Sequence, residues 1–171
     1  MEFVPTDRLS EWNDVWALAV VFGLASVPWT YAFVGPLDVP LWPAFIASAT
    51  FFAAGGGLQG LANGYASNLA GIVYAALTLA IVDGLLGGGL LALSVVVGAF
   101  MLLASLHEAV PVLSFTPGGF FGYATMFGVN AAEATAFGVA GLAGQTLAAV
   151  VSMLLGALIG FGADRASTAI E

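Results

Sequence analysis

The sequence has no cysteine, no lysine, a single histidine and few charged residues of any kind. Charged residues make up 7% of the 171 residues and hydrophobic residues 61%, whereas a typical soluble domain is about 25% charged and about 45–50% apolar. The missing cysteines exclude a disulfide scaffold and a cysteine-ligated metal site. The scarcity of cations excludes the basic surface that binds nucleic acid. The few polar residues cannot cover a soluble domain, so the sequence indicates an integral membrane protein.

The charges that are present are mostly negative. The formal net charge is −8, and the two cations are Arg8 and Arg165. An acidic surface without lysine favours a saline cytoplasm, where salt screens the repulsion between carboxylates. We therefore expect a halophilic, haloarchaeal source; the alternative is a membrane protein that needs few cations. Because the arginines lie near the two ends of the chain, the positive-inside rule predicts a multi-pass protein of the plasma membrane with both termini cytoplasmic.

The apolar residues form six segments, four long and two short. The long segments cover residues 15–34, 58–82, 85–106 and 136–162, and the short ones cover 41–54 and 120–128. A helix needs about 20 residues to cross a bilayer, which the long segments satisfy and the short ones do not. Pro43 and Pro117 stand where the first turns of the short helices are expected. We predict an all-α membrane protein.

The order long, short, long occurs twice, which indicates an internal repeat. Ala49-Thr50-Phe51-Phe52-Ala53 resembles Ala124-Thr125-Met126-Phe127-Gly128, and both stretches lie in the short segments. We predict one transmembrane domain built from halves 15–82 and 85–162, with polar cytoplasmic ends at 1–14 and 163–171. If the short segments span the membrane, the second half is inverted, as in many transporters. If they are re-entrant, the repeat is parallel; in both cases the termini share one side.

Uncharged polar side chains recur on one face of the third segment. Gln59, Asn63 and Ser67 are spaced by four residues, which places them in one row on a helix. Such side chains are costly toward lipid, so the row is expected to face protein or water. It predicts either a pore lining for a small polar solute or hydrogen bonds between helices. Gln145 is the amide of the last segment and a candidate symmetry partner of this row.

The short segments are the other candidates for a site. A helix that begins inside the membrane presents unpaired N–H groups, which a polar group, water or a solute must satisfy. The alternative is a kinked structural helix satisfied by its neighbours. The apolar side chains Phe52 and Phe127 are candidate constrictions. The pore-lining or gating candidates are Thr50, Phe52, Gln59, Asn63, Ser67, Thr116, Thr125, Phe127 and Gln145.

The sequence contains no nucleophile–base–acid set, no metal-ligand spacing and no phosphate-binding loop. We therefore expect no enzyme activity, no cofactor and no metal. His107-Glu108 is interpreted as the cytoplasmic boundary between the fourth and fifth segments. The middle of each span lacks ionisable residues, which favours a passive pathway over an ion-coupled pump.

These observations favour a channel or facilitator for a small, mostly neutral polar solute such as urea, an amide, ammonia or a polyol. The alternative is a structural or partner-binding membrane subunit that transports nothing. A chain this small has little interior, so besides the lipid bilayer and the solute we expect a second partner, another copy of the chain in a homo-oligomer.

Two stretches also resemble a known family. Leu41-Trp42-Pro43-Ala44-Phe45, continuing through Gly56-Gly57-Leu58-Gln59-Gly60-Leu61, is similar to the small membrane proteins catalogued as domain of unknown function 1097. Leu113-Ser114-Phe115-Thr116-Pro117-Gly118-Gly119-Phe120-Phe121-Gly122 is similar to the same family. The resemblance implies a multi-span inner-membrane protein without an established activity, so it assigns no site residues.

Overall fold

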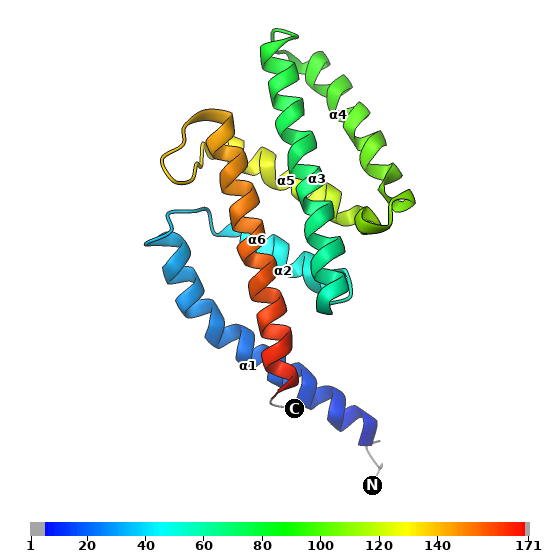
Figure 1. The fold of residues 1–171 in the computed structure, drawn as a ribbon, viewed down its shortest axis with the longest axis vertical. Helices are drawn as coiled ribbons and strands as arrows, with labels where there is room; N and C mark the ends of the chain where they lie inside the picture. Colours follow the sequence, from blue (N-terminus) through cyan, green and yellow to red (C-terminus); the bar gives the residue numbers. More distant parts are fainter. Residues whose placement is uncertain (1–5, 170–171) are drawn as a thin grey trace.

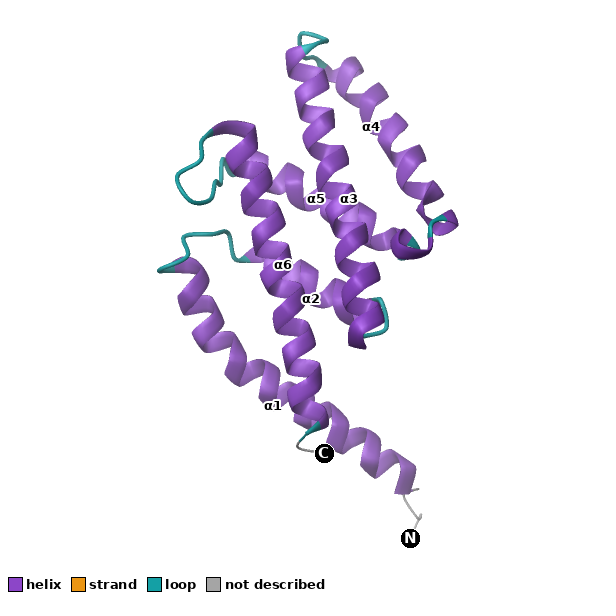
Figure 2. Cartoon of the chain, in the orientation of Figure 1, coloured by secondary structure: helices purple, strands orange, loops and turns teal. Residues whose placement is uncertain are grey.

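The computed structural model describes residues 6–169, and this part of the chain is helical (Figure 2). Its elements are α1 (Thr6–Val34), α2 (Trp42–Ala53), α3 (Gly57–Gly84), α4 (Leu90–Ser105), the 3₁₀ turns η1 (Leu106–Ala109) and η2 (Pro111–Leu113), α5 (Thr116–Ala131) and α6 (Gly141–Thr168). The predicted all-α fold with four long and two short helices is confirmed.

Four segments are long and apolar enough to cross a membrane. They are Val15–Val34 in α1, the whole of α3, Leu90–Ala109 across α4 and η1, and the whole of α6. Helices α2 and α5 have 12 and 16 residues, so as straight helices they extend only about 18 and 24 Å, less than a bilayer core of about 30 Å. The chain is therefore built as a multi-pass membrane protein.

The two halves of the chain are intertwined. Helices α3 and α6 pack together at the centre, and α2 and α5 lie across them (Figure 1). Helix α2 packs mainly on α6 and α5 mainly on α3, so each short helix packs on the long helix of the other half. The outer helices follow the same rule, because α1 packs on α6 and α4 packs on α3.

Corresponding helices of the two halves run in opposite directions. In Figure 1, α1 and α3 run upward whereas α4 and α6 run downward, and α1 begins at the same end of the molecule at which α6 ends. Together with the exchanged packing, this is the arrangement of an inverted repeat with a pseudo-two-fold axis between the halves.

Glycines allow the helices to cross closely and also fix which residues correspond. At Gly156 of α6 a side chain would overlap the backbone of Ala44 in α2, and at Gly71 of α3 it would overlap the backbone of Gly119 in α5. Ala44 and Gly119 hold equivalent places in the short helices, each six residues before the threonine of the sequence echo. Gly71 and Gly156 are therefore equivalent positions of the repeat.

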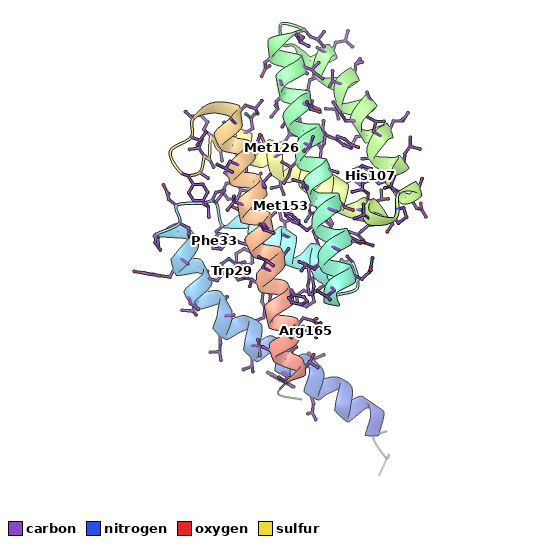
Figure 3. The ribbon with its side chains drawn as sticks, in the orientation of Figure 1. Trp29, Phe33, His107, Met126, Met153 and Arg165 are labelled. Atoms are coloured by element: carbon purple, nitrogen blue, oxygen red, sulfur yellow. The ribbon has the colours of Figure 1, made fainter. Side chains whose placement is uncertain are left out.

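Two pairs of glycines spaced by four residues serve this packing: Gly60 and Gly64 on α3, and Gly156 and Gly160 on α6. Gly60 lies against the backbone of Phe51, and Gly160 lies against the Phe51 ring and Ser48. The pair on α3 and the pair on α6 thus both pack against the short helix α2. Around these crossings lies the core, which includes the fully buried Met126 and Met153 near the middle of the molecule (Figure 3).

Several predicted helix boundaries are wrong by a turn or more. Helix α4 begins at Leu90 rather than at residue 85, because Gly87, Gly88 and Gly89 have φ values of +71°, +79° and +99° and form the preceding loop. Helix α1 begins before the apolar run, at Thr6.

The boundaries of α5 and α6 also differ from the predicted ones. Helix α5 covers Thr116–Ala131 instead of 120–128, since proline is favourable in the first turn and Pro117 occupies it. Helix α6 covers Gly141–Thr168 instead of 136–162, because the chain forms a loop as far as Gly141, whose φ is +68°.

Candidate functional site

Five polar side chains are buried where the four inner helices cross, and we call them the central polar set. They are Thr50 of α2, Ser67 and Asn68 of α3, Thr125 of α5 and Ser152 of α6, each at most 1% exposed. Ser67 and Ser152 each lie one turn before the glycine at which their helix crosses a short helix. None of the five is ionisable.

Four of these five side chains have an atom without a hydrogen-bond partner. The unpartnered atoms are Ser67 Oγ, Asn68 Nδ2, Thr125 Oγ1 and Ser152 Oγ. Buried polar atoms in proteins are nearly always paired, and an unpaired one costs about 1–3 kcal/mol. Thr50 is the exception, because its hydroxyl donates to the carbonyl oxygen of Ile46 at 2.8 Å and lies 3.4 Å from Oδ1 of Asn68. The centre therefore holds unused hydrogen-bonding capacity.

The repeat relates most of the set in pairs. Thr50 corresponds to Thr125 through the sequence echo, and Ser67 corresponds to Ser152 because each precedes its crossing glycine by four residues. Asn68 has no polar counterpart, since the equivalent residue is Met153. The amide thus occurs in one half only; the backbone of Asn68 lies against Gly122 of α5, and its Oδ1 lies 3.4 Å from Thr50 Oγ1 of α2.

The predicted polar row on α3 leads from an exposed end of the helix to the central polar set. At the start of α3, Gln59 Nε2 donates to Asn63 Oδ1 at 2.9 Å, and Asn63 Nδ2 donates to Ser114 Oγ at 3.3 Å. Ser67, one turn further on, is fully buried beside Gly118 at the start of α5. The row therefore faces the η2–α5 junction, where Asn63 hydrogen-bonds to Ser114 just before α5.

Gln145 belongs to a different place. Its Oε1 accepts a hydrogen bond of 2.9 Å from Asn130 Nδ2, which joins the start of α6 to the end of α5. Since α3 and α6 run in opposite directions, the starts of these helices lie at opposite ends of the molecule (Figure 1). Gln145 therefore lies at the opposite end of the molecule from Gln59, near the start of its own helix, and the two side chains are not neighbours. The candidate residues therefore occupy two ends and a centre.

The remaining candidates, Phe52, Phe127 and Thr116, do not belong to the central polar set. The Phe52 ring packs edge-on against Phe51 and Phe22, with centroids 5.0 and 6.1 Å apart. The Phe127 ring stacks on Tyr123 at 5.1 Å. The two phenylalanines thus pack on different aromatic neighbours. Thr116 begins α5 and is half-buried.

A second buried polar group was not predicted as a site. His107 is 3% exposed, and its Nε2 lies 3.1 Å from the Tyr74 hydroxyl. Tyr123 Oη lies 2.7 Å from Thr78 Oγ1, which itself donates to the Tyr74 carbonyl. The predicted break between the fourth and fifth segments at His107 is correct in sequence, and the side chain is buried within the protein. The 3₁₀ turn η1 folds it against α3 and against Gly119, which has no side chain to exclude it.

Sequence reasoning missed Asn68, Ser152 and Asn130 as site residues. Asn68 stands one position off the i, i+4 row that selected Ser67. Ser152 shares a helical face with Gln145 in the sequence, but its place in the central polar set follows only from the two-fold relation. Within residues 6–169, no three His, Asp or Glu side chains are grouped so as to hold a metal ion.

Comparison with known proteins gives one relation. No curated protein and no solved structure matches the chain. The model of one family, described as "Protein of unknown function (DUF1097)", matches residues 19–168, from the first membrane-spanning helix to the end of the last. The match covers most of the sequence and includes both stretches that suggested the resemblance. The chain therefore belongs to the DUF1097 family.

Proposed function

We propose that the protein is a passive channel or facilitator for a small, neutral polar solute, with both termini in the cytoplasm. The observation that carries this proposal is the central polar set, with its four unpartnered polar atoms at the crossing of α2, α3, α5 and α6. In the low dielectric of a membrane protein, such atoms favour a ligand that hydrogen-bonds to them. A solute in transit can exchange its hydrogen bonds with water for bonds with these groups.

The composition of the set supports a neutral solute. Hydroxyl and amide groups offer donors and acceptors but no counter-charge, and an ion would need one at this depth. The proposed route begins at the exposed end of α3, at Gln59 and Asn63, and passes the central polar set. It ends at the Asn130–Gln145 pair. Because the central side chains are buried, passage requires α2 or α5 to shift relative to α3 and α6.

Stopped-flow flux into proteoliposomes tests this proposal, with water, urea, acetamide, glycerol and ammonia measured in parallel. Asn68→Leu removes the central amide while retaining side-chain volume, and the loss of one or two hydrogen bonds to the solute is expected to lower flux about tenfold. Asn63→Leu, at the entrance, is expected to lower flux as well. Ser105→Ala, on the exposed face of α4, is the control and leaves flux unchanged.

Two results would contradict the proposal. Unchanged flux in Asn68→Leu, with the variant shown to be folded by circular dichroism, excludes the central polar set as the route. Flux no greater than that of empty liposomes for every solute favours the second candidate function, a structural or partner-binding subunit.

Helix α4 is the observation that favours this second function. Among its residues only Ala104 is buried, and the helix exposes a broad apolar face; the exposed side chains include Leu90, Leu91, Val95, Leu102 and Leu103. Besides lipid, a partner subunit or a second copy of the chain would cover this face, so we also propose a homo-oligomer that contacts through α4. We propose a halophilic source on the net charge of −8.

A further inference from the structure

Residues at the end of α5, in the following loop and at the start of α6 line an open polar hollow. This loop lies away from the end of the molecule at which α1 starts (Figure 1). The volume of the hollow is about 520 Å³, and it is lined by Asn130, Glu133, Thr135, Gly138, Val139, Ala140, Gly141 and Gln145. The grooves on the helical faces of the molecule are lined almost entirely by apolar side chains, so this hollow differs from them in chemistry. A volume of this size accommodates a small solute with several waters.

The amide groups of the hollow are held in place and retain bonding capacity. Gln145 is only 8% exposed, and its oxygen accepts the hydrogen bond from Asn130. That bond uses one of the two Asn130 N–H donors and one acceptor of Gln145. The Asn130 amide oxygen and the Gln145 amide N–H₂ therefore stay free of this pair, one as an acceptor and the other as a donor.

Two further features of the lining supply hydrogen-bond donors on one side and an acceptor on the other. Helix α6 starts at the hollow with Ala140 as its N-cap, and no side chain caps its first N–H groups, which are hydrogen-bond donors at the positive end of the helix dipole. Glu133 contributes a carboxylate to the lining, from a backbone with φ of +51° just after α5. Donors thus come from α6, and acceptors come from the end of α5 and the residues that follow it.

A primary amide or urea matches this arrangement better than the other solutes of the proposed class. Its N–H₂ group can donate to a carboxylate, while its carbonyl oxygen accepts from the amide N–H groups and from the first N–H groups of α6. Ammonia offers a single lone pair, so it can satisfy only one of these donors. A polyol offers hydroxyl oxygens, which are weaker acceptors for these N–H groups than an amide carbonyl oxygen.

We propose that this hollow is a binding site for primary amides and urea at the mouth of the solute route. The inference rests on the proposed function and deepens it by naming the solute class. It also assigns roles to Asn130, Glu133 and Gln145. Asn130 and Gln145 orient the solute through their paired amides, and Glu133 accepts a hydrogen bond from its N–H₂ group.

Cysteine protection tests the site without measuring transport. The chain has no cysteine, so Ala140→Cys places a single thiol in the lining of the hollow, and Ala132→Cys places an exposed one outside it. Both are modified with N-ethylmaleimide in the intact protein, with and without acetamide. By mass action, acetamide at twice its dissociation constant slows modification of Ala140→Cys about threefold and leaves Ala132→Cys unaffected.

Matched variants assign the effect to the named groups. Gln145→Leu in the Ala140→Cys background is expected to abolish protection, whereas Gln59→Leu, the same substitution at the other end of the route, retains it. Glu133→Gln is expected to weaken protection by acetamide, because a neutral amide oxygen accepts less strongly than a carboxylate. Equal protection by acetamide and glycerol in the unmodified site, or no protection by either, overturns the proposal.

The outcomes also separate this site from the proposed function. Protection by acetamide in a protein that shows no solute flux keeps the binding site and overturns the channel. Flux that depends on Asn68, without any protection of Ala140→Cys, keeps the channel and overturns the binding site.

Discussion

At the scale of single residues, two buried serines differ in whether their hydroxyl group has a hydrogen-bond partner. Ser48 Oγ lies 3.0 Å from the Ala44 carbonyl oxygen and 2.7 Å from the Gly156 carbonyl oxygen, so it joins α2 to α6. Ser67 Oγ is equally buried and has no partner. The same hydroxyl group thus joins a helix pair at one position, while at the other it has no hydrogen-bond partner within the protein.

This difference predicts opposite effects of the same substitution. Ser48→Ala is expected to lower the free energy of unfolding by about 1 kcal/mol, because an interhelical hydrogen bond is lost. Ser67→Ala is expected to change it by less than about 0.5 kcal/mol and to lower solute flux. Unfolding in mixed micelles and flux in proteoliposomes check both. A large loss of stability in Ser67→Ala with unchanged flux would identify Ser67 as a packing residue.

The residue scale also shows what the sequence can and cannot predict. The row of Gln59, Asn63 and Ser67 follows from helical spacing alone, and it lies on α3 as predicted. Asn68 was missed as a site residue because its burial depends on α5, which arrives from the other half of the chain. The tertiary partner of a side chain is not encoded in local spacing, so the central polar set required the structure.

At the scale of helices, close crossings decide the packing. At Gly71 of α3 an added Cβ would overlap the backbone of Gly119 and Tyr123, and backbone atoms cannot rotate away. At Gly98, on the outer helix α4, an added Cβ meets nothing within 4 Å. The two glycines stand in helix interiors and differ only in what surrounds them.

Gly71→Ala is therefore expected to destabilise the protein by about 1–3 kcal/mol through overpacking. The control Gly98→Ala is expected to leave stability unchanged or to raise it by up to about 1 kcal/mol, because alanine is the better helix former. Thermal unfolding followed by circular dichroism in detergent compares them. Equal midpoints for the two variants would mean that the α3–α5 crossing is looser than described.

Helix existence was predictable, while helix length was not. Pro43 and Pro117 locate the starts of the short helices, and the apolar runs locate the long ones. Helix α5 nevertheless extends to Ala131, beyond the predicted end at residue 128; in its last turn Val129 is fully buried and Asn130 bonds to Gln145 of α6. The boundary errors thus come from packing at this end and from the glycine loops before α4 and α6.

At the scale of the whole molecule, the two halves depend on each other. Each short helix buries its surface against a long helix of the other half, so neither half could cover its own crossing surfaces alone. The repeat itself was predicted from the order of segment lengths and the echo around Thr50 and Thr125. The exchange of partners was not, because two weakly similar sequences do not specify which half each short helix will contact.

The inverted repeat makes a prediction about sidedness that needs no assumption about transport. Because the second half is inverted, the C-terminal ends of α2 and α5 should reach opposite faces of the membrane. Ala53, at the end of α2, and Ala132, just after α5, are both exposed. In intact cells, an impermeant maleimide is expected to label Ala132→Cys and to label Ala53→Cys only after lysis, since positive-inside orientation places Arg165 in the cytoplasm. Labelling of both from one side would contradict the opposite directions of the two halves, whereas a reversed pattern would keep the inverted repeat and place the termini outside.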